Sequence, residues 1–364
     1  MQLKYKPDWE ETKERYRQWW NHEYFGRCAL WVTAPKTNPP SIPKPPEPES
    51  IEQKWYDLDL ISARNDYGFS HTFYGGEAFP CWNGGYPGHT SISVFLGSPL
   101  TLDLKTGWKE PILKGENIEF QYLKINEESR SYQFAFETLR RGIKEAKGKS
   151  LVSVGAFGGC GDTLASLRGT EQLLYDCIER PEQIKAADEF LMDIWIDHYS
   201  KLYQITRKAN DGGSVNWFPL WAPGKFYPAH NDFAYNISPQ MYREIFLPAI
   251  EKQTRFLDYC VYHVDGVNNF VHVDTLLELP FRQLQAYQIA PGAGAPSALA
   301  YMDTLKKVQK AGRNLWISLP IGEIRSALEV LSARGLCICT NNVSSEEEAK
   351  ELLKNVERWS VDRG

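Results

Sequence analysis

The sequence predicts an α/β protein, best described as a (β/α)8 barrel with an elaborated N-terminal segment. Apolar runs of about five residues alternate with helical patterns of ten or more from about residue 128 onward. Six such strands follow residue 150 and at least one precedes it, an alternation typical of parallel βαβ units. Seven or eight parallel strands in 364 residues fit a barrel. An open doubly wound sheet is the alternative, weakened because no Gly-x-Gly-x-x-Gly follows the first strand.

The composition excludes several classes of protein. With 41 Lys and Arg against 46 Asp and Glu, the formal net charge is −5, so the chain lacks the basic excess of a dedicated nucleic-acid binder. No apolar run approaches the ~20 residues of a membrane-spanning helix. The first residues are polar and acidic, unlike a secretory signal, and the seven Cys are odd in number and scattered. These features predict a cytoplasmic protein with reduced thiols.

The N-terminal elements are assigned in chain order. The roughly helical spacing of Trp9, Tyr16 and Trp19 predicts a first helix over residues 8–22. It is followed by a strand over 28–33, a polyproline-like excursion over 35–48 that contains seven prolines, and a helix over 51–64. We interpret residues 1–70 as an N-terminal extension of a single domain that spans 1–364.

The later elements are assigned from periodicity and capping signals. Ser238 before Pro239 is an N-cap followed by a first-turn proline, and Ser345 with Glu348 forms a capping box. Helices are predicted over 128–147, 162–177, 181–210, 238–257, 301–311, 322–333 and from 345 onward. Strands are predicted over 151–155, 213–217, 260–263, 284–288, 315–319 and 336–340, and residues 100–125 resemble strands joined by turns.

A long loop over residues 71–97 is rich in Gly and aromatic side chains. Long loops of this composition are commonly found over binding sites, so we expect this one to cover the C-terminal mouth of the barrel. The expected contacts with the substrate cavity are Trp82 together with Phe79, Tyr86 and His89, with Glu77 near the mouth.

The most informative stretch contains His-x-Asp twice, as His263/Asp265 and His272/Asp274. His263 closes a predicted strand, and strand C-terminal ends form the active-site mouth of a barrel. A His and an Asp at that position can ligate a metal or exchange protons. Hydrogen bonds to neighbouring backbone are the alternative. For His272 and Asp274, helix capping and solvent contacts are the preferred interpretation.

Two thiols on a late strand extend this set. Cys337 and Cys339 are two residues apart, so they face the same side of the strand. Buried free thiols are their ordinary interpretation. Cys339 is nearest the strand's C-terminal end and shares the predicted pole of His263, about two strands away. His263, Asp265 and Cys339 would form a plausible zinc set.

Further polar residues are candidates for substrate contacts or catalysis. Asp232, Asp265 and Glu77 are the candidate acids or bases, and Asp162 follows a Gly-rich run; capping or turn roles are the alternative for each. Arg27 and Arg168 could bind a carboxylate, although packing roles are more common for Arg. The candidate substrate-binding residues are Trp82, Phe79, Tyr86, His89, Tyr262, Arg27 and Gln288.

The sequence resembles the uroporphyrinogen decarboxylase superfamily, in particular its bacterial branch labelled "trimethylamine corrinoid protein 2"-like. The resemblance lies in GGEAFPCWNGGYPGHTSISVFLG (75–97), DTLASLRGTEQLLYDCIERPEQI (162–184), DFAYNISPQMYREIFLP (232–248), YHVDGVNNFVHVDTLLELP (262–280) and APGAG (290–294). It implies a (β/α)8 barrel whose site lies at the C-terminal mouth. The superfamily includes cofactor-free decarboxylases and zinc enzymes that transfer a methyl group between a corrinoid protein and a thiol.

In the zinc enzymes of this superfamily, a His-x-Cys motif and a distant Cys hold the metal. Here His263 matches the His, Asp265 stands where the first Cys would be, and Cys339 matches the distant Cys. Carboxylate is an acceptable zinc ligand. No N-terminal arginine-rich motif accompanies Arg27, which argues against a porphyrinogen with many carboxylates.

The resemblance therefore implies a zinc-dependent methyltransferase of one-carbon or demethylation metabolism. It would act on a small-molecule substrate, with the corrinoid carried by a separate protein. The alternative enzyme is a hydrolase or lyase acting on a sugar or ring-shaped substrate, with Asp232 and Asp265 as paired carboxylates. A decarboxylase-like enzyme or a binding protein on the same barrel is the remaining alternative.

Overall fold

The computed structural model describes residues 1–85, 88–115 and 118–364. The main sheet has seven strands in the order β2-β1-β11-β10-β9-β8-β7. Their bounds are β1 Ala29–Pro35, β2 Thr72–Gly76, β7 Ala229–His230, β8 Val261–Asp265, β9 Ala286–Ala290, β10 Asn314–Ser318 and β11 Leu336–Thr340. Every neighbouring pair is parallel except β1 with β2.

Two further pairs of strands complete the β structure of the described residues. β3 (Cys81–Trp82) and β6 (Leu151–Val152) are parallel, whereas β4 (Leu100–Leu102) and β5 (Gly107–Lys109) form an antiparallel hairpin. The predicted α/β class with a mainly parallel sheet is therefore confirmed. The described strands do not pair into one closed sheet of eight parallel strands, so the closed barrel remains a prediction.

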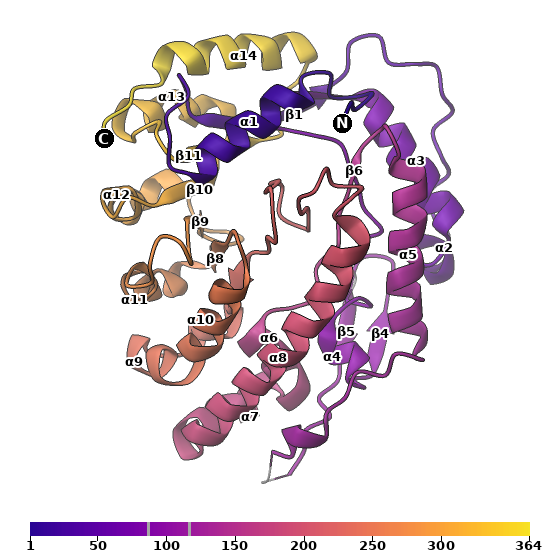
Figure 1. Ribbon diagram of the computed structural model, residues 1–364, viewed down its shortest axis with the longest axis vertical. Helices are drawn as coiled ribbons and strands as arrows, with labels where there is room; N and C mark the ends of the chain where they lie inside the picture. Colours follow the sequence, from indigo (N-terminus) through magenta and orange to yellow (C-terminus); the bar gives the residue numbers. More distant parts are fainter. Residues whose placement is uncertain (86–87, 116–117) are drawn as a thin grey trace.

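Helices are ranged around the strands (Figure 1). The α-helices are α1 Trp9–Trp20, α2 Ile51–Trp55, α3 Leu58–His71, α4 Ile92–Phe95, α5 Arg130–Ala146, α6 Cys160–Arg168, α7 Thr170–Glu179, α8 Pro181–Thr206, α9 Pro239–Met241, α10 Leu247–Phe256, α11 Val273–Leu277, α12 Met302–Lys310, α13 Ile321–Val330 and α14 Glu346–Trp359. Short 3-10 segments are η1 Phe120–Tyr122, η2 Asp232–Asn236, η4 Val267–His272 and η5 Ala298–Tyr301, and η3 Tyr242–Phe246 is a π-helical turn. No helix in these ranges is long and apolar enough to cross a membrane.

Several predicted elements differ from the structure. The helix predicted over 51–64 is divided into α2 and α3, and three others differ for local reasons. The predicted helix over 162–177 is divided at Gly169, whose φ of +89° lies in a region that helical residues do not adopt. The helix over 238–257 contains the π-helical turn just before Pro248, which cannot donate a backbone N–H. The predicted strand over 213–217 is reduced to a single bridge between Ser214 and Ala222.

The two faces of the main sheet are buried in different cores. One face contributes Ala29, Val261, Ala286, Trp316, Cys337 and Cys339 to a core shared with the aromatic side chains of α1. The alternate residues, such as Leu30 and Tyr262, pack in the core formed with the surrounding helices. In the first core the ring centroids of Trp20 and Phe226 lie 5.1 Å apart. The rings that predicted α1 therefore cover one face of the sheet.

The segment 71–97, predicted as a loop, contains β2, β3 and α4. Its residues Phe79, Trp82 and His89 are buried, which corrects the prediction that they line the cavity. Trp82 is 1% exposed and belongs to the helix-side core, where it contacts α5 at Gly142. Phe79 packs edge-on against Trp9 with 5.6 Å between ring centroids. His89 is buried against Tyr56 and Phe134. Tyr86 lies outside the described residues.

The contact between α5 and Trp82 gives a stability prediction. A Cβ added at Gly142 would lie 2.6 Å from Cε3 of Trp82, a buried ring that cannot move freely. Gly142→Ala is therefore expected to lower the free energy of unfolding by about 1–3 kcal/mol, against the usual gain from Ala in a helix. Gly322→Ala on α13 is the matched control, because nothing lies within 4 Å of its added Cβ. Urea unfolding curves check both; equal stability of the two variants would contradict this packing.

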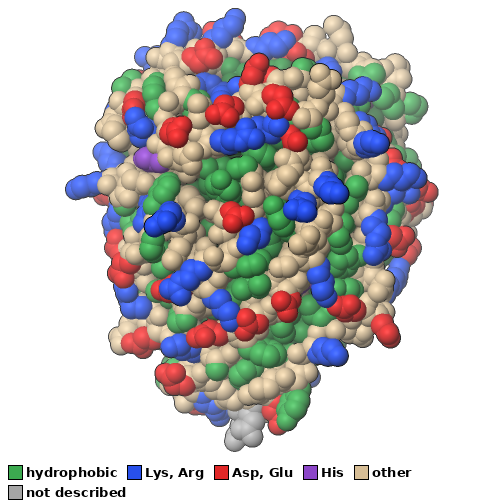
Figure 2. All heavy atoms as spheres, in the orientation of Figure 1, with side chains coloured by type: hydrophobic (Ala, Val, Ile, Leu, Met, Phe, Trp, Pro, Cys, Tyr) green, Lys and Arg blue, Asp and Glu red, His purple; other side chains and the backbone are tan. Residues whose placement is uncertain are grey.

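The surface carries charges of both signs. On the face shown in Figure 2, basic and acidic side chains are interspersed, in keeping with a formal net charge of −5. Many of the exposed ion pairs contribute little to stability, because solvent screens them.

Candidate functional site

A cavity of about 380 Å³ lies beside the C-terminal residues of β7 and β8. Its volume lies in the range of small-molecule sites. The lining residues are Gly88, Ser91, Lys109, Ala156, Gly158, Asp162, Trp217, His230, Asp232 and His263. The segment 71–97 therefore reaches the site through Gly88 and Ser91, and not through Phe79, Trp82 or His89.

The parallel register of β7 and β8 brings two histidines together. His230 and His263 are paired positions on the neighbouring strands, and their ring centroids lie 6.4 Å apart. The ring of Trp217 stands edge-on to both, at 6.0 Å from His230 and 5.3 Å from His263. This indole forms a wall of the cavity and limits how far either imidazole can turn.

Two carboxylates complete a set of potential metal ligands. Asp265 follows His263 by two residues on β8 and therefore shares its face of the strand. Asp232 is the first residue of η2, directly after β7. One ligand atom from each of Asp232, His263 and Asp265 lies within 4.8 Å of the others. Sequence analysis predicted all three as site residues, and the structure brings them together.

Gln288 determines which nitrogen of His263 faces the cavity. The Nδ1 atom of His263 hydrogen-bonds to Oε1 of Gln288, its paired residue on β9. Because a carboxamide oxygen only accepts, Nδ1 carries the proton and Nε2 keeps its lone pair. Burial and the neighbouring His230 lower the pKa of His263 from its usual value, so the imidazole is neutral near pH 7. Gln288, predicted as a substrate-binding residue, thus orients the imidazole of His263 and is not among the residues that line the cavity.

Asp162 adds a second carboxylate to the His230 side of the cavity. Its Oδ2 lies 3.5 Å from Nε2 of His230, and its Oδ1 accepts a 2.9 Å hydrogen bond from the backbone N–H of Phe233. This bond fixes the loop that carries Asp232. Partial desolvation at the cavity, followed by repulsion from Asp162, raises the pKa of Asp232 to about 6, although its side chain is exposed to solvent.

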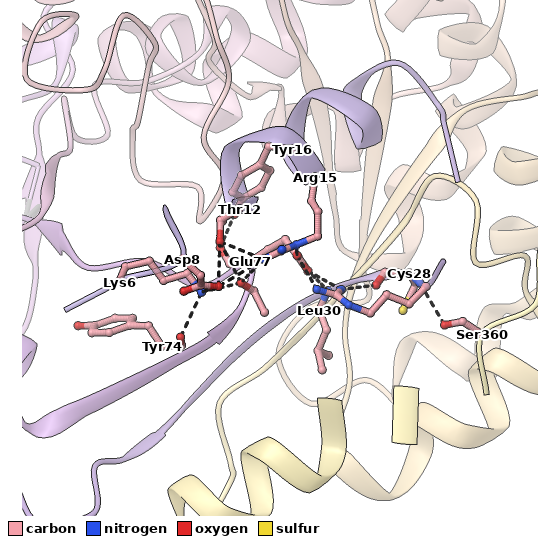
Figure 3. Close-up of polar contacts among 12 residues, drawn as sticks. Lys6, Asp8, Thr12, Arg15, Tyr16, Cys28, Leu30, Tyr74, Glu77 and Ser360 are labelled. Carbon is pink, nitrogen blue, oxygen red and sulfur yellow. Dashed lines mark hydrogen bonds and ion pairs between the residues drawn. The ribbon is translucent and has the colours of Figure 1, made fainter. Parts of the chain in front are cut away.

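Glu77 and Arg27 lie away from the cavity, which corrects their predicted roles in catalysis and substrate binding. Glu77 is fully buried and accepts two 2.8 Å hydrogen bonds from Arg27 and one of 2.6 Å from Nε of Arg15 (Figure 3). Burial alone would raise the pKa of Glu77, but Arg27 and Arg15 outweigh it and lower this pKa to about 2. The cluster of Arg15, Arg27 and Glu77 joins α1 to the ends of β1 and β2.

Cys339 does not belong to the set of Asp232, His263 and Asp265. As expected, the side chains of Cys339 and Cys337 lie on the same face of β11. The strands of Cys339 and His263 also run in the same direction, because β8 to β11 are parallel. However, β11 is three positions from β8 in the sheet, and among the described residues Cys339 is absent from the group of converging ligand atoms. Burial raises the pKa of its thiol to about 12.

The other predicted residues have structural contacts outside the cavity. Tyr262 faces the helices, and its hydroxyl lies 2.8 Å from that of Tyr242, which corrects its predicted role in substrate binding. His272 hydrogen-bonds to the Ala234 carbonyl at 2.9 Å. Asp274 pairs with Lys307, and Arg168 pairs with Asp176.

His230, Trp217 and Lys109 line the cavity but were not predicted from the sequence as site residues. For His230, a usable signal exists: it follows Phe226, Tyr227, Pro228 and Ala229, an apolar run before a polar residue that resembles the end of a strand. Trp217 and Lys109 carry no comparable local signal, because only the tertiary structure brings them to β7 and β8.

A solved structure of a methyltransferase from Methanosarcina mazei is similar to this chain. The similarity covers 95% of this chain and 98% of that chain, with a TM-score of 0.57 and 12% sequence identity. At this identity the likeness concerns the fold. No family model and no curated protein matches the sequence. Membership of the uroporphyrinogen decarboxylase superfamily therefore remains a prediction.

Proposed function

We propose that the protein is a metal-dependent, methyltransferase-like enzyme on a (β/α)8-type scaffold. It would move a methyl group between a corrinoid, carried by a separate protein, and a small thiol acceptor. The observation that carries this proposal is the convergence of ligand atoms of Asp232, His263 and Asp265 to within 4.8 Å beside a cavity. The name of the similarly folded methyltransferase from Methanosarcina mazei supports the reaction class.

The three side chains suit a catalytic zinc ion. Catalytic zinc sites use three protein ligands of nitrogen, oxygen or sulfur and leave one position open. Here Asp232 takes the place that sequence analysis gave to Cys339. His263 offers Nε2, because Gln288 holds the proton on Nδ1. When bound, zinc would lower the pKa of a thiol and so favour the nucleophilic thiolate.

The remaining cavity residues would bind the acceptor and manage its proton. Nε2 of His230 lies 3.5 Å from Oδ2 of Asp162. In this proposal it would accept a proton from the thiol, and the carboxylate would stabilise the resulting imidazolium. Trp217 would exclude water from the space between the two histidines.

The experiment that tests this function is a methyl-transfer assay with protein purified without chelator. Free methylcobalamin replaces the corrinoid protein, and 3-mercaptopropionate is the acceptor. We expect methylated thiol and a matching loss of methylcobalamin absorbance, both abolished by chelation and restored by zinc. Transfer that persists after the metal is removed, or no transfer by fully zinc-loaded protein, would overturn the proposal.

Replacing Gln288 tests how His263 is oriented. Gln288→Leu removes the acceptor for Nδ1, so zinc affinity is expected to fall by roughly 10–100-fold. Gln288→Glu is the matched control, because it retains an acceptor at the same position. Competition with a zinc-binding dye measures both affinities. Equal weakening in the two variants would show that the hydrogen bond to Nδ1 is irrelevant.

The alternative function is acid–base hydrolysis or elimination on a ring-shaped substrate. The raised pKa of Asp232, about 6, favours it because a general acid must hold a proton near neutral pH. However, the oxygens of Asp232 and Asp265 that lie within 4.8 Å of each other also lie within 4.8 Å of a ring nitrogen of His263. That proximity suits a shared cation better than two separate catalytic carboxyls.

A further inference from the structure

Lys109 places a cation in the cavity wall. It is the last residue of β5 and reaches the cavity from a hairpin, whereas its neighbour Trp108 is 56% exposed on the outside. The ammonium group of Lys109 makes no ion pair or side-chain hydrogen bond with any residue that the structure describes. Burying a charge without an opposite charge beside it costs free energy. A bound anion would therefore be stabilised next to the ammonium group of Lys109.

The nearest acid does not supply that compensation. Asp162 is the carboxylate whose charge acts on Lys109, but the two form no ion pair. Asp162 is instead engaged by the N–H of Phe233 and lies 3.5 Å from Nε2 of His230. The charge of the same carboxylate also acts on Asp232. Asp162 therefore interacts electrostatically with both Lys109 and Asp232, and all three residues line the cavity.

The cavity thus offers two kinds of contact. Its lining includes Asp232 and His263, where the proposed metal would bind. The same lining includes the cation of Lys109, together with Gly88 and Ser91. A volume of about 380 Å³ admits only a small molecule, so a single ligand could contact both kinds of group.

We propose that Lys109 anchors a carboxylate or similar small oxyanion of the acceptor substrate, whose other end reacts beside His263. This inference rests on the proposed function for the thiol at the reacting end. A charge-assisted hydrogen bond to the ammonium would favour an anionic acceptor over a neutral one of equal size. Lys109 would then determine specificity without taking part in the bond changes at sulfur.

The test compares two thiols of similar size, anionic 3-mercaptopropionate and neutral 2-mercaptoethanol, in the methyl-transfer assay. We expect the wild-type enzyme to prefer the anionic thiol by roughly 10–100-fold in kcat/KM. Lys109→Met should remove this preference by raising KM for the anionic thiol alone, and Lys109→Arg should restore part of it. Lys105→Met, exposed on the same hairpin, is the matched control and should change nothing.

A binding measurement separates this proposal from the proposed function. Calorimetric titration of the zinc-loaded protein with propionate, which cannot accept a methyl group, should give tighter binding to wild type than to Lys109→Met. If propionate binding depends on Lys109 but no methyl transfer occurs, the anchor stands and the methyltransferase function fails. If transfer occurs and neither propionate binding nor thiol preference changes in Lys109→Met, the anchor is overturned.

Discussion

Replacing Glu77 by glutamine is expected to lower the free energy of unfolding by about 3–5 kcal/mol. The substitution preserves shape but removes the charge that compensates Arg27, a guanidinium only 7% exposed. It also weakens the 2.6 Å contact with Arg15, which holds α1 near β2. Urea unfolding at pH 7 measures the effect. Glu14→Gln, whose partner Arg17 is exposed on the same helix, should change stability by no more than about 0.5 kcal/mol.

The pH dependence of this effect has a definite sign. The pKa of Glu77 is about 2 in the folded protein and about 4.3 in an unfolded chain. A lowered folded-state pKa gives stability that is present above pH ~4.3 and is lost as the pH falls towards 2. The lost contribution is about 3 kcal/mol, from 1.36 kcal/mol per unit. The stability difference between wild type and Glu77→Gln should therefore shrink over that interval. A constant difference would contradict the ionised pair.

His263→Ala is expected to lower kcat/KM for methyl transfer by at least ~100-fold. The variant removes the imidazole that Gln288 orients, so the proposed metal would lose its only nitrogen ligand in the group of Asp232, His263 and Asp265. The methylcobalamin assay measures the loss, and circular dichroism checks that the variant is folded.

Cys339→Ser is the matched control for this prediction. Cys339 lies on the same face of the sheet but outside the group of Asp232, His263 and Asp265. Its replacement should retain most of the activity. If Cys339→Ser lost most of its methyl-transfer activity and His263→Ala lost little, the prediction would be contradicted, and the thiol would be the catalytic group instead of the histidine.

The strands were more predictable than the site because strand patterns are local. The run Leu336–Thr340 was predicted with the bounds that β11 has, since all five of its residues are buried. His263 and Asp265 were placed correctly because a two-residue spacing on a strand fixes a common face. In contrast, β7 spans only two residues after Pro228, so its periodicity was too short to reveal that His230 pairs with His263.

Side-chain roles in the 71–97 loop were not predictable from composition. Trp82 packs against Gly142 and Phe79 packs against Trp9, and both partners are distant in sequence. Burying these rings in the core stabilises the fold more than exposing them to a cavity would. In the sequence, Glu77 cannot be told apart from a catalytic carboxylate. Its structural role becomes evident only from its contact with Arg27 in the folded protein. The placement of Cys339 depended on how far β11 lies from β8 in the sheet, which is three positions where about two were expected.

The most direct test of the central claim is the metal content of protein purified without chelator. Inductively coupled plasma mass spectrometry should find about one zinc per chain in the wild type and in Cys339→Ser. His263→Ala and Asp232→Ala should contain almost none, because each removes one of three ligands that converge within 4.8 Å. Full zinc content in His263→Ala, or its loss in Cys339→Ser, would contradict a metal centre built from Asp232, His263 and Asp265.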